Sequence, residues 1–131
     1  MASDSTAYGM TLRNFFTYPD LPNPSHLIEQ AVWIEKLGFE SVWVWDHMLL
    51  GVDPHFPIID ALSLLTAVAA RTNRVKLGTG ILILPLRNPV LLAKQLASID
   101  LISNGRLLPG LASGWYKREF DACGVDFHRR G

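Results

Sequence analysis

Apolar, strand-like segments alternate with amphipathic, helix-like segments along nearly the whole of this chain. Strands are predicted over residues 8–16, 39–45, 75–84 and 106–113, and helices over residues 24–37, 58–72 and 89–103. Strict alternation of this kind indicates an α/β fold with a parallel sheet, because each helix carries the chain back to the same end of the sheet. A doubly wound sheet and a (β/α)8 barrel can both begin in this way. A complete barrel needs roughly 250 residues, and the 131 residues here are about half of that.

The third apolar segment, residues 75–84, is the least ordinary of the four. It is apolar enough for a strand buried on both faces, yet it contains Gly78 and Gly80. Glycine inside a strand often marks a bulge or the close approach of a ligand or another backbone. Pro85 is expected to end the strand, and Asn88, which precedes a proline, is expected to cap the next helix. The alternative is a plain core strand with two packing glycines.

Polar and small residues follow the predicted strands where each strand ends. Asp46 and His47 come directly after the second strand, and Ser113 and Gly114 close the fourth. Right-handed crossovers place the carboxyl ends of all the strands on one side, where both candidate folds build their sites. His47 is the strongest candidate for an acid or base, because histidine titrates near neutral pH. The alternative is a histidine that anchors a loop by bonding Asp46.

Composition limits the classes of partner and the cellular compartment. Hydrophobic residues make up 49% of the chain and charged residues 18%, against about 25% in ordinary domains. Lys+Arg and Asp+Glu number 12 each, so the net charge is zero and nucleic-acid binding is not expected. The single cysteine, Cys123, allows no intrachain disulfide and fits a cytoplasmic location. Residues 1–7 lack signal-peptide features, and no apolar stretch is long enough to span a membrane.

Several other conspicuous side chains are expected to be structural. Trp33, Trp43 and Trp45 are assigned to the core, and Cys123 is expected to be buried in a helix. The remaining histidines, His26, His55 and His128, are expected at the surface. The sequence shows no spacing of residues typical of metal ligands.

Four motifs together carry a family resemblance. They are Trp-Val-Trp-Asp-His at 43–47, Val-Lys-Leu-Gly-Thr-Gly-Ile at 75–81, Asn-Pro-Val at 88–90 and Gly-Arg-Leu-Leu-Pro-Gly-Leu-Ala-Ser-Gly-Trp at 105–115. In this order they resemble the bacterial luciferase-like monooxygenases. The tail at 119–131, which begins Glu-Phe-Asp-Ala-Cys-Gly, resembles the segment after the fourth strand in members that depend on the deazaflavin coenzyme F420.

The resemblance implies that residues 1–131 form one domain, the N-terminal half of a TIM (β/α)8 barrel. Such a barrel binds coenzyme F420, or FMN as the alternative, at its C-terminal face. The residues implied at the ring are Asp46 and His47, with His47 as acid or base; Gly80 and Ile81, joined by a non-prolyl cis peptide, with Ile81 supporting the ring; and Ser113 with Gly114.

The implied function is that of an F420- or flavin-dependent oxidoreductase, which transfers hydride between the deazaflavin and a small organic substrate. The alternatives are an FMN-dependent monooxygenase and a catalytically silent fragment that serves as an oligomerising or binding module. The resemblance departs in two respects: family chains are usually much longer and carry later phosphate-binding loops, and Pro109 lies within the fourth strand. A half barrel leaves its inner face open, with residues of 42–44 and 81–83 lining it, so a homo-oligomer is expected.

Overall fold

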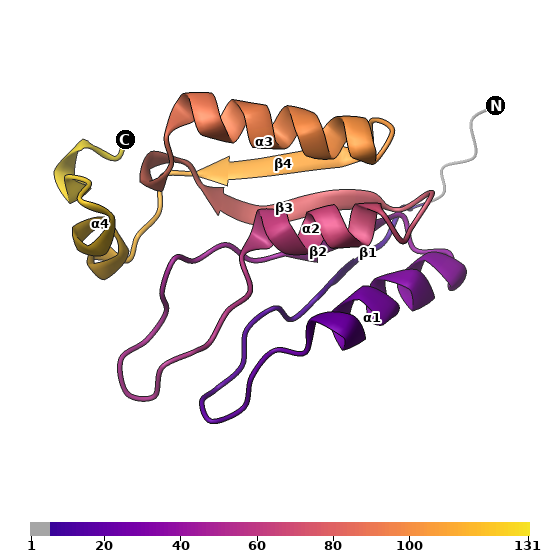
Figure 1. Cartoon of the computed structure of the whole chain (residues 1–131), viewed down its shortest axis with the longest axis horizontal. Helices are drawn as coiled ribbons and strands as arrows, with labels where there is room; N and C mark the ends of the chain where they lie inside the picture. Colours follow the sequence, from indigo (N-terminus) through magenta and orange to yellow (C-terminus); the bar gives the residue numbers. More distant parts are fainter. Residues whose placement is uncertain (1–5) are drawn as a thin grey trace.

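The four strands of the sheet hydrogen-bond to one another in the order in which they occur along the chain, and every neighbouring pair is parallel. The computed structural model describes residues 6–131. The prediction that residues 1–7 are not a signal peptide therefore falls largely outside the described residues. The strands are β1 Gly9–Thr11, β2 Ser41–Val44, β3 Lys76–Ile83 and β4 Leu107–Ala112. The helices are α1 Pro24–Lys36, α2 Ala61–Ala69, α3 Pro89–Ile102 and α4 Lys117–Cys123, with short 3-10 helices η1 Leu84–Leu86 and η2 Phe127–Arg129. The predicted α/β class with a parallel sheet is confirmed (Figure 1).

Side-chain caps fix where the first three helices begin. Asn23 accepts the backbone N–H of His26 at the start of α1, and Asn88 accepts the N–H groups of Val90 and Leu91 at the start of α3. Helix α2 begins three residues later than predicted, because Asp60 is its N-cap and accepts the N–H of Ser63 at 2.8 Å. The α4 helix in the tail adds a fourth helix to the three that the alternation predicted.

One face of the sheet is covered by helices and the other is open. Val42, Val44 and Leu77 are fully buried in a cluster with residues of α1 and α2. The opposite face carries Trp43 and Gly78, which are neighbours in register. The expectation that both 42–44 and 81–83 line the open face is therefore wrong in detail. Side chains alternate across a strand, so Val42, Val44 and Leu82 are buried on the helix side.

Two of the three tryptophans assigned to the core lie at the surface, and so does Cys123. Trp33 is 61% exposed and Trp45 is 42% exposed, whereas Trp43 is half-buried and donates its ring N–H to Ser41 Oγ at 2.8 Å. Trp33 lies on α1, beside the edge strand β1, where the described part of the chain has no further element to cover it. Cys123 lies in a helix as predicted, at the end of α4, but it is exposed and not buried.

The first strand is shorter than the predicted 8–16, because a side chain takes over its pairing. Asn14 is fully buried. Its amide donates to the carbonyls of Trp45 and Ile59 at 2.8 Å each, and its carbonyl oxygen accepts the N–H of Trp45 at 3.1 Å. These bonds join the two chain segments that leave β1 and β2, so the loop that precedes α2 is held at the same end of the sheet.

The third strand has the irregular backbone that its glycines predicted. The register between β3 and β4 shifts between Thr79 and Leu82, and the peptide bond between Gly80 and Ile81 is cis, as the resemblance implied. A Cβ at Gly78 would lie 2.2 Å from the Trp43 ring, so this glycine marks a close approach. The strand ends at Ile83, just before Pro85. Pro109 lies on β4, an edge strand of the described sheet, where its missing N–H is tolerated.

No helix among residues 6–131 is both long and apolar enough to cross a membrane.

Candidate functional site

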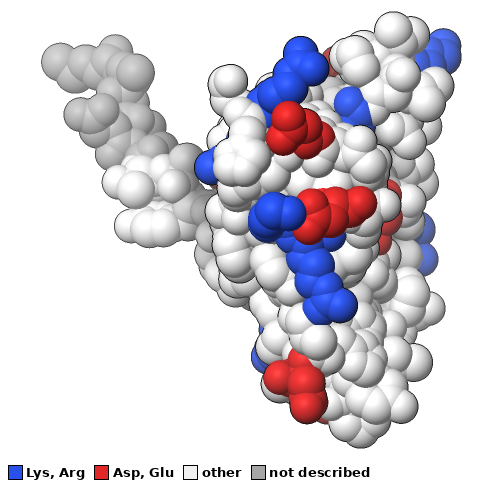
Figure 2. Space-filling model, turned by 90° about the vertical axis from the view of Figure 1, so that its left-hand side faces the viewer, with Lys and Arg blue, Asp and Glu red and all other residues white. Residues whose placement is uncertain are grey.

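A pocket of about 460 Å³ lies at the carboxyl ends of the strands. Most of its wall is apolar or aromatic; it is lined by Phe15, Trp45, Asp46, His47, Leu50, Phe56, Gly80, Ile81, Ile83, Gly114 and Trp115. The loops after β1 and β2 and the tail helix α4 gather at this end of the sheet (Figure 1). Figure 2, which looks onto this end, shows positive and negative side chains close together on a largely uncharged surface. Neither lysine nor arginine is among the lining residues.

Five of the six residues that the sequence placed at the ring line this pocket. They are Asp46, His47, Gly80, Ile81 and Gly114. Ser113 does not line the pocket. It is exposed and lies one position before the turn at Gly114. Gly114 has a φ of +79°, and a Cβ there would lie 2.6 Å from Ile83 Cγ2. A side chain at position 114 would therefore be strained and would crowd the pocket wall.

The carboxylate of Asp46 is bonded to protein groups. Oδ2 accepts the N–H of Ile83 at 2.8 Å, and Oδ1 accepts Nη2 of Arg87 at 2.6 Å. Arg87 also reaches Asp60 Oδ1 at 3.4 Å, and its Nε is buried without a partner in the described part of the chain. Asp46 therefore ties the end of β2 to the end of β3. This geometry favours a role for Asp46 in orienting the site over the direct contact with a cofactor that the resemblance implied.

Asp60 links the same network to helix α2. Burial by itself raises the pKa of Asp60, but the hydrogen bonds from Ser63 and the charge of Arg87 outweigh it and hold the pKa below the ordinary value. The carboxylate is thus ionised at neutral pH and pairs with the buried guanidinium.

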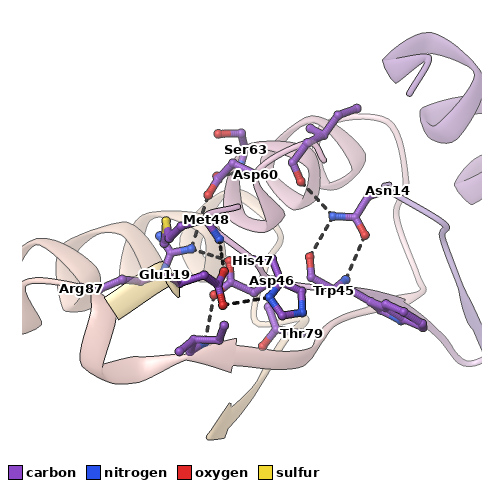
Figure 3. Close-up of polar contacts among 12 residues, drawn as sticks. Asn14, Trp45, Asp46, His47, Met48, Asp60, Ser63, Thr79, Arg87 and Glu119 are labelled. Carbon is purple, nitrogen blue, oxygen red and sulfur yellow. Dashed lines mark hydrogen bonds and ion pairs between the residues drawn. The ribbon is translucent and has the colours of Figure 1, made fainter. Parts of the chain in front are cut away.

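His47 is held by Glu119 of the tail helix, and not by the neighbouring Asp46. Nδ1 of His47 lies 3.0 Å from Oε2 of Glu119, whose side chain is fully buried (Figure 3). The other oxygen, Oε1, accepts the backbone N–H groups of Met48 at 2.6 Å and Leu49 at 3.3 Å. One buried carboxylate therefore fixes both the ring of His47 and the loop that follows it.

Glu119 and Arg87 are the site residues that sequence reasoning missed. Glu119 lies 72 positions from His47 and falls in the tail motif, where only its place in the pattern was noted. In the sequence, Glu119 stands directly before the aromatic Phe120, which the structure shows to be fully buried. An acidic residue next to an aromatic residue was the only sign in the sequence that Glu119 is itself buried. Arg87 offered a weaker one, as a lone cation between Pro85 and the cap of α3.

Aromatic rings shape the rest of the pocket. The ring of Trp115 meets that of His47 edge-on at a centroid distance of 6.0 Å, and Phe15 lies against Trp45 at 4.7 Å. Gly80 leaves backbone bare between them: a Cβ there would meet only Trp43, at 3.8 Å, and would otherwise fill open space. The pocket can thus accept a flat apolar group and present one polar nitrogen, Nε2 of His47, which has no partner in residues 6–131. Within the same residues, no cluster of three His, Cys, Asp or Glu could hold a metal ion.

The sequence pattern that defines the luciferase-like monooxygenases matches residues 4–131. The chain belongs to this family. Within the family, the F420-dependent glucose-6-phosphate dehydrogenase of Amycolatopsis mediterranei (strain U-32) is 41% identical over 107 residues, which cover 79% of this chain and 32% of that enzyme. The 4-hydroxyprotoasukamycin monooxygenase of Streptomyces nodosus subsp. asukaensis is 32% identical over 100 residues, 76% of this chain and 26% of that enzyme.

Solved structures of the family give the same fold. An F420-dependent secondary alcohol dehydrogenase, solved with an F420-acetone adduct, superposes with a TM-score of 0.76 at 27% identity over 92% of this chain and 36% of its own. The monooxygenase RslO1 from Streptomyces bottropensis gives 0.75 at 30% identity, with 95% and 38% covered. The present chain thus spans about a third of the length of these relatives. It has the fold of part of a luciferase-like TIM barrel, as the sequence predicted.

Proposed function

We propose that this chain forms the ring-binding part of an F420-dependent oxidoreductase that acts on a small organic substrate. The observation that carries the proposal is the juxtaposition of His47 with bare backbone at Gly80 and Gly114 inside an apolar pocket. A deazaflavin or flavin is a flat tricyclic ring, and such rings bind in concave, mostly apolar sites with few polar groups.

The residues present fit the ring of such a cofactor better than its phosphate-bearing tail. Ile81 is 39% exposed and projects from the bulge in β3, where it can support one face of a ring. Gly80 and Gly114 leave space that a Cβ would occupy. Phosphate groups are usually held by helix N-termini and cationic side chains, and the pocket lining contains no lysine or arginine.

The bound cofactor would supply the site that accepts or releases hydride. The work of the chain is to position the ring, exclude water and manage a proton. When a hydroxyl-bearing carbon is oxidised, its hydrogen leaves with the electron pair, and the hydroxyl proton must go to a base. His47 is the group placed to take that proton at Nε2, and to return it in the reverse direction.

F420 is favoured over FMN because the F420-dependent dehydrogenases are the more similar relatives, at 38–41% identity. An FMN-dependent monooxygenase is the second candidate. Its monooxygenase activity, though not its cofactor, is supported by the 32% identity to the 4-hydroxyprotoasukamycin monooxygenase.

Titration of the 131-residue chain with F420 and with FMN, followed by cofactor fluorescence, tests the proposal. We expect saturable binding that prefers F420, with a dissociation constant weaker than about 1 µM, which corresponds to ~8 kcal/mol. The affinity is limited because nothing in the pocket lining neutralises phosphate. Ile81→Ala should weaken binding about tenfold, whereas Leu101→Ala, an exposed aliphatic position on α3, should not. Binding of neither cofactor would contradict the proposal, and submicromolar affinity would contradict the account of the missing phosphate contacts.

A further inference from the structure

We propose that Glu119 is a positioning residue that fixes the tautomer of His47, with the hydrogen on Nδ1 and the lone pair of Nε2 presented to the pocket. The use of that lone pair in proton transfer rests on the proposed function. The tautomer itself follows from contacts within the chain and can be measured without any cofactor.

The geometry around the carboxylate assigns the donors and acceptors. Oε1 of Glu119 faces the N–H groups of Met48 and Leu49, at 2.6 and 3.3 Å, so it can only accept there. Oε2 faces Nδ1 of His47 at 3.0 Å. An ionised carboxylate has no hydrogen to give, so the neutral imidazole must carry its hydrogen on Nδ1.

The same carboxylate is itself rigidly placed. Glu119 lies in the first turn of α4, its side chain has no exposed area, and the adjacent Phe120 is fully buried and packs edge-on against Phe127 at 5.2 Å. The ring of Trp115 also meets the imidazole edge-on. The ring of His47 is therefore contacted by two side chains of the segment that follows β4, while no side chain of its own loop hydrogen-bonds to it in residues 6–131.

The tautomer decides what His47 can do to a substrate. With the hydrogen on Nδ1, the neutral ring meets the pocket as a proton acceptor, which suits removal of a hydroxyl proton during oxidation. With the hydrogen on Nε2, it would meet the pocket as a donor and could not act as the base. Glu119 thus influences the reaction through His47 and does not line the pocket itself.

Nitrogen-15 NMR of the imidazole rings in the 131-residue chain tests the assignment at a pH at which histidine is neutral. We expect Nδ1 of His47 to resonate as a protonated nitrogen and Nε2 as an unprotonated one. His26, His55 and His128, all exposed, give the internal reference for rings that exchange between tautomers. A His47 signal from the Nε2–H form, or one averaged like those of the exposed rings, would overturn the proposal, and this measurement needs no variant.

Glu119→Gln makes the test sharper, because the glutamine can keep one acceptor and gain a donor. Its carbonyl can still accept the N–H groups of Met48 and Leu49, while its NH2 now faces Nδ1 of His47. We expect the tautomer to switch to Nε2–H. Asp121→Asn is the matched control on the same helix, since Asp121 is exposed and pairs with Lys117. An unchanged tautomer in Glu119→Gln, or the same switch in the control, would count against Glu119.

The outcome is separable from that of the cofactor titration. An Nδ1–H tautomer without cofactor binding would retain the role of Glu119 and refute the proposed function. Cofactor binding with an Nε2–H tautomer would do the reverse.

Discussion

His47 should affect turnover more than any other histidine of the chain. It lines the pocket and has one nitrogen free toward it, whereas His26 and His128 are exposed and lie outside the lining. If the chain has the proposed F420-dependent turnover, we expect His47→Ala to lower kcat by about 10²–10⁴, the usual range for loss of a general acid or base. His26→Ala and His128→Ala serve as matched controls and should leave kcat within about twofold. Equal losses from all three substitutions would exclude the assignment.

Residue by residue, position in the chain predicted more of the site than residue chemistry did. Asp46, His47 and Gly114 could be placed because each lies just beyond the carboxyl end of a parallel strand, and parallel strands end on one side. The partner of His47 could not be placed. Asp46, its neighbour in sequence, turns to Ile83 and Arg87, while Glu119 arrives from 72 residues away. Which acid a histidine meets depends on tertiary packing, and spacing carries little information about that.

At the scale of elements, capping residues located helix starts better than hydrophobic runs did. Asn23 and Asn88 begin α1 and α3 where predicted. Helix α2 was predicted too long, because the run at its start is apolar although Asp60 caps the helix inside that run. Trp33 was assigned to the core, yet it is 61% exposed on α1. The exposure of Trp33 depends on which sides of α1 pack against other elements. The hydrophobic pattern within one helix does not show where those other elements lie.

Arg106 should be the largest single contributor to stability at the end of the sheet opposite the pocket. Its guanidinium donates five hydrogen bonds of 2.6–2.9 Å. One goes to the hydroxyl of Thr72. The other four go to backbone carbonyls near the ends of α2 and α3 and the start of β3, those of Ala69, Thr72, Val75 and Ser103. Burial lowers the pKa of Arg106, partly offset by the charge of Glu35. Arg106→Met would leave several buried acceptors unpaired and should cost about 3 kcal/mol or more.

Urea denaturation at one fixed protein concentration would measure this loss. Arg71→Met is the control, because the ion pair of Arg71 with Glu29 is more than half exposed on both sides and should be worth at most about 1 kcal/mol. Similar losses from the two substitutions would show that the buried hydrogen bonds of Arg106 have little net effect.

Stability should also fall in acid, partly through Glu35. Burial alone raises the pKa of Glu35, but the N–H groups of Val75, Arg74 and Asn73 and the charge of Arg106 outweigh it, so the folded-state pKa is lower than the ordinary 4.5. A lowered folded pKa means that the stabilisation is complete above pH 4.5 and is lost as the pH falls through the folded value. Because Glu35 is partly exposed, we expect the effect to be about 1 kcal/mol or less. Denaturation midpoints between pH 7 and pH 3 should fall less steeply for Glu35→Gln than for the wild type, and parallel curves would contradict this.

At the scale of the whole molecule, the parallel α/β sheet could be predicted because alternation and right-handed crossovers leave few other arrangements, whereas its place in a barrel was implied only by the family resemblance. The composition of its open face could not. Strand alternation places only every second residue there, and the register shift in β3 changes which residues these are. The open face is formed around Trp43, Gly78 and Leu108, and Leu108 is 40% exposed.

We predict that the 131-residue chain associates through this open face. Large apolar side chains, Ile81 and Leu108 among them, are exposed on this face, and β1 and β4 both present unpaired edges in the described sheet. The net charge is zero, so long-range repulsion does not oppose association. Two copies related by two-fold symmetry can set β4 of one beside β1 of the other, which approximates a closed barrel.

Light scattering coupled to size exclusion should therefore give a mass of twice 14.6 kDa or more. Leu108→Glu places a charge on the open face and should shift the population toward the monomer, because a charge buried at an apolar interface is costly. Leu21→Glu introduces the same charge at an exposed loop position away from that face and should leave the mass unchanged. A sharp wild-type peak at 14.6 kDa with cooperative thermal unfolding would mean that the open face is stable in water without a second copy.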